Sequence, residues 1–160
     1  MLIGIISDTH DNLPVILRAV EVFNERRVGH VIHAGDFTSP FTFRALKHLA
    51  CDFTGIYGNN DGERVLLQKL SHARIFTQPY ILELANRKIV IMHEHQVVDA
   101  LADSGHFDLV IYGHTHEPDI RKRGNTLIVN PGELSGWLHG TSTIAVADLA
   151  TLSAELIALQ

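Results

Sequence analysis

The sequence is poor in cysteine, in basic residues and in long apolar runs, and each shortage excludes a class of protein. Cys51 is the only cysteine among 160 residues, which excludes disulfides and thiolate metal sites within one chain. Lys and Arg number 13 against 18 Asp and Glu, and no dense basic run occurs, so a nucleic-acid partner is not expected. No apolar stretch approaches the roughly 20 residues that span a bilayer, so no membrane partner is expected either.

Histidine, by contrast, is abundant. The chain has 11 His residues, and its 46% hydrophobic and 19% charged fractions are typical of soluble globular proteins. We expect one domain over residues 1–160, long enough to bury a substantial core. Asp8 and His10 interrupt the apolar start too early for a signal peptide, and we therefore expect a cytoplasmic protein.

Strand and helix patterns alternate through the first half of the chain. Apolar runs predict strands at residues 2–6, 31–34 and 53–57. A helix should follow the first strand, with Asn12 as its N-cap and an apolar face made of Leu13, Ile16, Leu17, Val20 and Phe23. Further helices are predicted at residues 40–49 and 65–70. This order favours βαβ units and a parallel sheet.

The second half of the chain predicts hairpins as well as helices. One hairpin joins residues 80–84 to 88–92, and another crosses a turn at residues 123–125. A helix is expected at 97–102, a strand at 108–112, and closing strands at 141–146 and 154–158. The two halves together predict an α/β protein in which two sheets pack against each other with helices outside.

Side chains able to bind metal ions follow five of the predicted strands. In chain order they are Asp8 and His10, Asp36, Asn59, His93, and His114 with His116. Because ligands of open α/β sheets bind outside the carboxyl ends of the strands, we expect these side chains to converge. Seven nitrogen and oxygen ligands are too many for one tetrahedral zinc ion but fit two ions that share a carboxylate. The sequence therefore predicts a binuclear metal site.

Each segment also has an ordinary structural interpretation. Asp8 and His10 could cap the following helix, and Asp36 could belong to a plain turn. The segment 58–62 is a good turn sequence by itself, and His93 could be a hydrogen-bonded core histidine. We prefer the metal-site interpretation because all five segments coincide with strand ends.

Five motifs resemble those of one enzyme superfamily. They are Asp8-x-His10, Gly35-Asp36, Gly58-Asn59-x-Asp61, His93 and Gly113-His114-x-His116. Their order, from Ile3 to about Gly132, resembles the calcineurin-like metallophosphoesterase superfamily and its small YfcE-like phosphodiesterase branch. The resemblance implies a four-layer α/β/β/α sandwich of two mixed β-sheets flanked by helices.

The resemblance also implies a ligand set and a reaction. One metal ion would be bound by Asp8, His10, Asp36 and His116. The other would be bound by Asp36, Asn59, His93 and His114, with Asp36 bridging. The implied enzyme is a metal-dependent phosphoric diester hydrolase in which a metal-bridging hydroxide attacks a small or generic phosphodiester in line. The cofactors would be two divalent ions, manganese first, with iron, zinc, cobalt or nickel as alternatives. The chain could also form a homo-oligomer.

The chain departs from the family pattern near the expected phosphate position. Many members have His after the asparagine, where this chain has Asn60, an amide that cannot act as a general acid. We therefore expect weak activity on phosphomonoesters and a preference for diesters with good leaving groups. The candidate catalytic auxiliaries are Asn60, Asp61 and His95. Of these, Asp61 is expected to support the ligands by hydrogen bonds, and His95 either replaces the missing acid or is a spectator.

Three other residues receive ordinary structural interpretations. Glu94 stands where the branch usually has Gly, and we expect it to face solvent. Glu133, where Ser is common, is expected to belong to a rigid turn after Pro131. Trp137 is expected to be partly buried by packing.

Two other functions compete with the enzyme. A non-catalytic protein-interaction scaffold of the retromer-subunit type uses the same fold, but its metal sites are degraded, whereas all seven ligands are intact here. A nuclease is disfavoured by the acidic net charge of −5 and by the absence of a DNA-binding extension.

Overall fold

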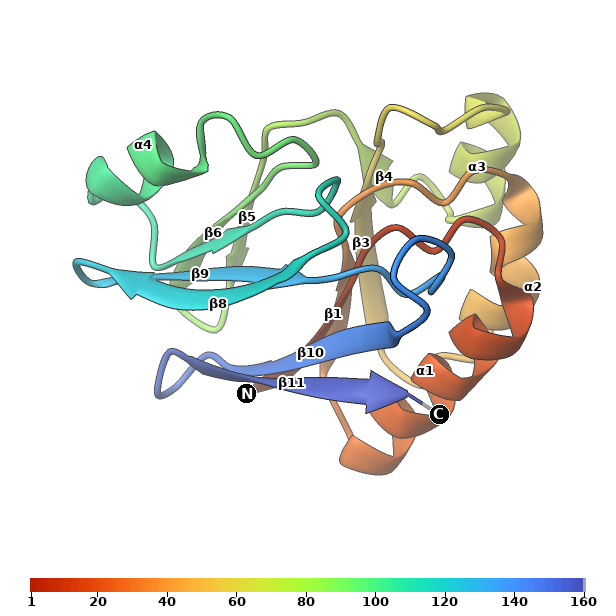
Figure 1. Ribbon diagram of the computed structural model, residues 1–160, viewed down its shortest axis with the longest axis horizontal. Coiled ribbons are helices and arrows are strands. Elements are labelled where there is room, and N and C mark those ends of the chain that lie inside the picture. The colour runs from red at the N-terminus through yellow and green to blue at the C-terminus, as the bar shows by residue number, and fades with distance from the viewer. Residues whose placement is uncertain (160) are drawn as a thin grey trace.

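Two mixed β-sheets form the centre of the computed structural model, which describes residues 1–159 (Figure 1). The first sheet has the strand order β11-β10-β1-β2-β3-β4. Its strands are β1 (Leu2–Ile6), β2 (His30–His33), β3 (Asp52–Ile56), β4 (Ile75–Phe76), β10 (Ser142–Asp148) and β11 (Ser153–Leu159). Strands β1 to β4 are parallel, whereas β10 and β11 add antiparallel strands at the β1 edge.

The second sheet has the order β5-β6-β7-β9-β8. Its strands are β5 (Tyr80–Leu84), β6 (Arg87–Ile91), β7 (Leu109–Ile111), β8 (Pro118–Arg123) and β9 (Thr126–Pro131). The central strands β6, β7 and β9 are parallel, and the antiparallel strands β5 and β8 lie at the two edges. Both predicted hairpins are therefore present.

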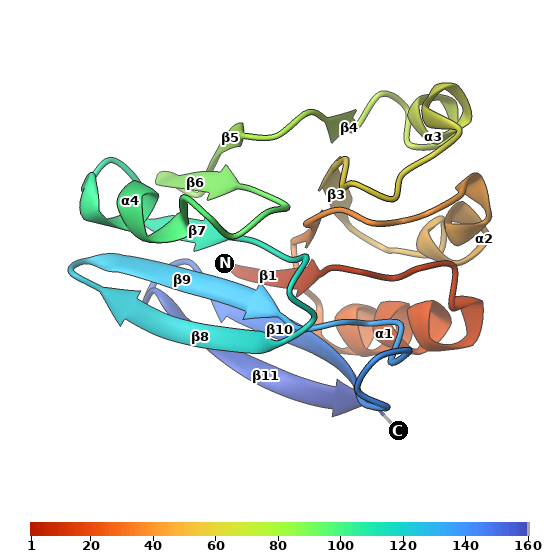
Figure 2. The same cartoon turned by 45° about the horizontal axis from the view of Figure 1, so that its top comes forward.

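Helices cover the outer faces of both sheets. The helices α1 (Leu13–Arg26), α2 (Phe43–Leu46) and α3 (Arg64–Leu70) lie beside the first sheet, together with the short 3₁₀ helix η1 (Pro40–Thr42). The helix α4 (Val98–Asp103) covers the second sheet, away from α1 (Figure 2). A continuous apolar core lies between the sheets. This arrangement is the predicted four-layer α/β/β/α sandwich.

The alternation of side chains along β1 shows how the layers are joined. Ile3 and Ile5 enter the core between the sheets, whereas Ile6 packs on the helical side. Gly4 also faces the helical side, where a Cβ atom would lie 2.6 Å from the ring of Phe23 in α1. The absence of a side chain at Gly4 thus lets α1 pack directly on the strand.

Two local predictions need correction. The helical stretch expected at 40–49 is broken into η1 and the single turn α2, and Asn24 of α1 binds the backbone of His48 and Ala50 where the stretch ends. Asn12 does precede α1, but its side chain makes no cap and donates instead to the carbonyl oxygen of Ser135 at 2.7 Å. Within residues 1–159, no helix is long and apolar enough to cross a membrane.

Candidate metal centre

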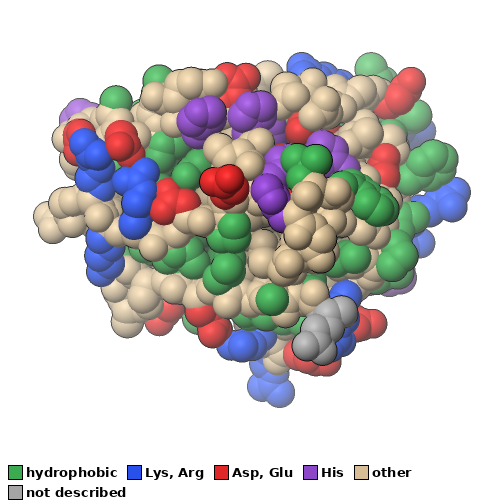
Figure 3. All heavy atoms as spheres, in the orientation of Figure 1, with side chains coloured by type: hydrophobic (Ala, Val, Ile, Leu, Met, Phe, Trp, Pro, Cys, Tyr) green, Lys and Arg blue, Asp and Glu red, His purple; other side chains and the backbone are tan. Residues whose placement is uncertain are grey.

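The carboxyl ends of five strands bring the predicted ligands to one edge of the molecule. Asp8 and His10 follow β1, Asp36 follows β2, Asn59 follows β3, His93 follows β6, and His114 and His116 follow β7. Because β1 to β3 are parallel neighbours, as are β6 and β7, their ends lie on the same side. Histidine side chains gather on the face seen in Figure 3.

One group of ligands, here called half-site 1, consists of Asp8, His10 and His116. Oδ1 of Asp8 lies 3.3 Å from Nε2 of His116 and 3.9 Å from Nε2 of His10. The two imidazole rings stack with their centroids 5.3 Å apart. One nitrogen or oxygen from each residue lies within 4.8 Å of the others, a separation compatible with binding one cation.

The second group, half-site 2, consists of Asn59, His93 and His114. Oδ1 of Asn59 lies 2.9 Å from Nε2 of His93 and 2.9 Å from Nδ1 of His114. Asp36 lies between the two half-sites, because its Oδ2 is 3.4 Å from Nε2 of His93 and 3.7 Å from Nε2 of His10. The geometry is compatible with one carboxylate shared between two cations.

Buried atoms without partners show that these residues fit a cation. Oδ1 of Asp8 and Nε2 of His10 are both buried and have no hydrogen-bond partner among the residues that the structure describes. Burying an unpaired polar atom is unfavourable, and a bound cation would satisfy both. A set of imidazole, carboxylate and amide donors suits first-row divalent ions such as Mn²⁺, Fe²⁺ or Zn²⁺.

The imidazoles are oriented by groups behind them. Nδ1 of His93 donates to the carbonyl oxygen of Ala34 at 2.8 Å, which leaves Nε2 as the ring nitrogen that faces Asp36 and Asn59. Nδ1 of His10 is held by the hydroxyl of Thr38 at 3.0 Å. Fixing one ring nitrogen in this way sets the tautomer that a metal requires at the other.

The backbone at the site is unusual. Asp8, His10, Asp36, His114 and His116 all have positive φ values, between 38° and 68°. Residues other than glycine adopt this region at a cost, and such strain concentrates where function requires one orientation. The sequence pattern gave no sign of these conformations.

Asp36 is held ionised by its neighbours. Burial raises the pKa of its carboxyl, but hydrogen bonds and charge from His93 and two N–H donors of Asn60 outweigh burial and lower it. The backbone N–H of Asn60 donates to Oδ1 of Asp36 and its side-chain amide to Oδ2, both at 2.8 Å. The Asn60 amide is thus engaged with the shared carboxylate.

Asp61 ties two ligand loops together. Its carboxylate accepts backbone N–H groups of Asp36 at 3.1 Å, Thr38 at 2.8 Å and Gly58 at 2.7 Å. Burial raises the pKa of Asp61, against the effect of these donors. Asp61 therefore acts on the loop backbones that carry Asp36 and Asn59, and its contacts are those of a supporting residue.

Glu133 is a site residue that the sequence interpretation missed. Its side chain is 1% exposed, and Oε2 accepts from Nδ1 of His116 at 3.0 Å, so a rigid turn does not describe its role. The Asp8 carboxylate, 3.3 Å from Nε2, and the hydrogen bond to Glu133 together outweigh burial and raise the pKa of His116 to about 9. Burial raises the pKa of Glu133, but its hydrogen-bond donors lower it to about 2.

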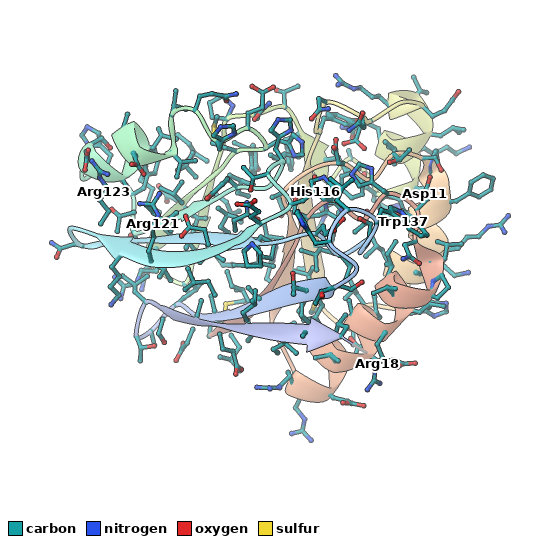
Figure 4. The ribbon with its side chains drawn as sticks, viewed as in Figure 1. Asp11, Arg18, His116, Arg121, Arg123 and Trp137 are labelled. Carbon is teal, nitrogen blue, oxygen red and sulfur yellow. The ribbon has the colours of Figure 1, made fainter. Side chains whose placement is uncertain are left out.

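The remaining candidates lie around the mouth of the site. His95 is exposed and stacks on His114 at 6.0 Å between ring centroids. Glu94 is half-buried, not fully solvent-facing, and lines a hollow of about 280 Å³ together with Asn59 and Arg64. Trp137 is 65% exposed, more than the expected packing role predicts. Its indole Nε1 donates to the carbonyl oxygen of His10, and it lies near His116 in Figure 4.

Comparison with known proteins identifies relatives along almost the whole chain. Residues 1–152 match the calcineurin-like phosphoesterase superfamily domain. The chain is 42% identical over 154 residues to Phosphodiesterase MJ0936 of Methanocaldococcus jannaschii, an alignment that covers 92% of this chain and 93% of that protein. It is also 26% identical over 143 residues to Phosphodiesterase YfcE of Escherichia coli K12, covering 81% and 77% of the two chains.

A solved structure agrees with these matches. The structure described as a novel archaeal phosphodiesterase superimposes with a TM-score of 0.92 at 41% identity. The superposition covers 99% of this chain and 100% of that one. The two chains therefore share one fold over nearly their whole length.

Proposed function

The chain belongs to the calcineurin-like phosphoesterase superfamily, and on that premise we propose that it is a metal-dependent hydrolase of phosphodiesters. One observation above all supports this proposal. Two buried aspartates, Asp8 and Asp36, face imidazoles at the sheet edge, and among the described residues Oδ1 of Asp8 and Nε2 of His10 have no hydrogen-bond partner. The names of the two relatives, both phosphodiesterases, supply the reaction class.

The proposed ligands divide between two ions. Half-site 1 with Asp36 would bind one, half-site 2 with Asp36 the other, and Asp36 would be shared. Two such ions supply a water acidified at neutral pH and positive charge for the phosphoryl oxygens. The protein's own contribution is to hold the Asp36 carboxylate ionised, to orient the imidazoles and to keep the ligand loops in place. We keep manganese as the first expectation for the metal.

The preference for diesters rests on Asn60. Its amide donates a hydrogen bond to Asp36 in this structure. An amide cannot act as a general acid that protonates a leaving oxygen. His95 is exposed beside His114, where it could deliver a proton to a leaving group. Without an acid at position 60, we propose that the enzyme acts on a small or generic diester with a good leaving group and poorly on alkyl phosphomonoesters.

Metal removal and readdition test the proposal. Protein treated with EDTA should not hydrolyse bis-p-nitrophenyl phosphate, and Mn²⁺ should restore the largest rate among Mn²⁺, Fe²⁺, Zn²⁺, Co²⁺ and Ni²⁺ added singly. Serine phosphate should be turned over at least about 10²-fold more slowly, the lower end of what general acid catalysis contributes. Absence of activity with every metal, despite two bound ions, would favour the scaffold function instead.

A further inference from the structure

The carboxylate of Glu133 connects half-site 1 to the loop that carries the only tryptophan. Oε2 accepts from Nδ1 of His116 at 3.0 Å and from the hydroxyl of Ser135 at 2.8 Å. Oε1 accepts backbone N–H groups of Leu138 at 3.0 Å and His139 at 2.6 Å. One buried side chain therefore binds a candidate metal ligand with one oxygen and a loop backbone with the other.

The tip of this loop, residues 136–140, depends on Glu133 for its attachment. We call these residues the Trp137 loop. The chain just before it is fixed independently, because the N–H of Ser135 donates to the carbonyl oxygen of Asp8 at 3.0 Å. Within the tip, Gly140 donates to Gly136 at 3.1 Å, which closes the loop on itself. The two bonds to Glu133 are what join the backbone of the tip to the molecule beneath.

The Trp137 loop forms an apolar wall beside half-site 1. The side chains of Trp137 and Leu138 are 65% and 69% exposed, although both are large and apolar. The indole Nε1 donates to the carbonyl oxygen of His10 at 3.4 Å, which places the ring next to a candidate ligand. An exposed aromatic beside a phosphoryl site is suited to contact the organic group of a diester.

We propose that Glu133 is a positioning residue that couples cation binding at His116 to placement of the Trp137 loop. By accepting from Nδ1, Glu133 directs the Nε2 lone pair of His116 towards half-site 1. A cation bound at Nε2 would keep the remaining ring proton on Nδ1, and the hydrogen bond from Nδ1 to Glu133 holds the carboxylate where it binds Leu138 and His139. Because such coupling is reciprocal, an ordered loop must favour the cation as much as the cation favours the loop. The apolar wall and the metal site are then assembled together.

The proposal rests on the proposed function in one respect, which is that it requires a cation site. Its test measures metal binding and fluorescence, not substrate turnover. We would titrate metal-free protein with Zn²⁺, a closed-shell ion, and follow acrylamide quenching of Trp137, the only tryptophan. Zn²⁺ should lower the quenching constant of the natural protein about twofold or more. In Glu133→Gln, the affinity for one of two Zn²⁺ ions should fall about 10–100-fold, and quenching should no longer respond to Zn²⁺.

Glu117→Gln is the matched control. Glu117 is exposed on the neighbouring loop, and its side chain has no hydrogen bond to His116. Its replacement by Gln removes the same charge as Glu133→Gln does. It should retain the natural zinc affinity and quenching response. Equal zinc affinities in Glu133→Gln and Glu117→Gln, or a normal quenching response in Glu133→Gln, would overturn the proposal.

A thermal readout separates positioning from simple support. A merely structural Glu133 would lower the melting temperature equally with EDTA and with Zn²⁺, whereas a positioning residue reduces the increase that Zn²⁺ produces. If Glu133→Gln does not fold, Ser135→Ala removes one donor from the same Oε2 atom. It should weaken one zinc site about two- to fivefold, and an unchanged affinity there would count against the coupling.

Discussion

The two ends of the sandwich each carry a cluster of aspartates, but the clusters differ in burial and in partners. At the candidate metal centre, Asp8 and Asp36 are almost completely buried and face imidazoles. On α4, Asp99 and Asp103 are about half exposed, and Arg123 contacts both of them. Figure 4 shows Arg123 far from His116. Acidic residues are therefore present in both places, while unsatisfied buried acceptors are found at the metal centre.

The difference shows which physical feature marks a site. The cluster at α4 adjoins a hollow of about 410 Å³ lined by Asp103, Phe107 and Arg123, larger than the one of about 280 Å³ beside Asn59. The α4 carboxylates, however, already have guanidinium partners, so a cation has nothing further to satisfy there. The candidate metal centre is distinguished by buried polar atoms that lack hydrogen-bond partners, not by charge density or cavity size.

The same substitution at the two ends should give the largest contrast. Asp36→Asn removes the shared negative charge, so kcat/KM for bis-p-nitrophenyl phosphate should fall about 10³-fold or more, the equivalent of several kcal/mol of metal-dependent stabilisation. Asp103→Asn should leave kcat/KM within about twofold, because surface charges away from a site seldom alter chemistry. Metal content and circular dichroism check binding and folding. Retention of activity within tenfold in Asp36→Asn would refute a shared carboxylate.

Alanine at one glycine from each end gives the next contrast. A Cβ atom at Gly113 would overlap Oγ of Ser7 and lie 2.7 Å from Oδ2 of Asp8, whereas at Gly124 no atom lies within 4 Å. Gly113→Ala should lower stability by about 1–3 kcal/mol through overpacking and reduce activity at least tenfold by displacing Asp8. Gly124→Ala should cost about 1–2 kcal/mol for its positive φ of 57° and leave activity unchanged. Urea unfolding and initial rates provide both measurements.

That the candidate ligands would lie together could be predicted from the sequence because of where they stand. Each stands in the loop that follows a short apolar run. Because the carboxyl ends of parallel strands lie at the same edge of a sheet, residues in these loops emerge at that edge. Asp36 and His93 are 57 positions apart in the chain, but the strands that they follow end close together in space. Local pattern and sheet topology together are sufficient for this part of the site.

What the sequence could not predict depends on contacts between distant segments. The bond between Glu133 and His116 forms only when the loop after β9 lies against the loop after β7. The exposure of Trp137 follows from the attachment of its loop to Glu133, which the sequence pattern does not show. Strand β4 has two residues, too few for any periodicity, and is defined by pairing with β3.

Acid should destabilise the fold through a histidine at the other end of β2. His30 is 6% exposed and its Nε2 contacts Oγ1 of Thr54 at 2.9 Å. Burial lowers its pKa below the ordinary value of 6.5. The unfolded chain then binds the proton more readily, so stability present above pH 6.5 is lost as the pH falls towards the folded-state pKa.

His30→Gln isolates this contribution. Gln retains a hydrogen-bonding group for Thr54 but does not titrate, so its loss of stability between pH 7.5 and 5.5 should be smaller than that of the natural protein. The difference is limited to about 1.4 kcal/mol, the value of one pH unit for one proton. Urea unfolding in EDTA measures it without interference from metal release. Identical pH profiles for the two proteins would show that His30 does not contribute.

The smallest effect is expected from the ion pairs beside α4. Arg123→Ala removes contacts to Asp99 and Asp103, all of them solvent-exposed, and exposed ion pairs are weak because water and salt screen them. The urea midpoint should change little, and the change should vanish in about 0.5 M NaCl, where the screening length is short. The kcat/KM value should stay within about twofold of the natural protein. A larger fall in activity would mean that α4, which packs on β7 and β9, affects the position of His114 and His116 at the end of β7. The two ends of the sandwich would then be coupled through that strand. The aspartates at the two ends would differ in the side chains that they contact, but both clusters would affect activity.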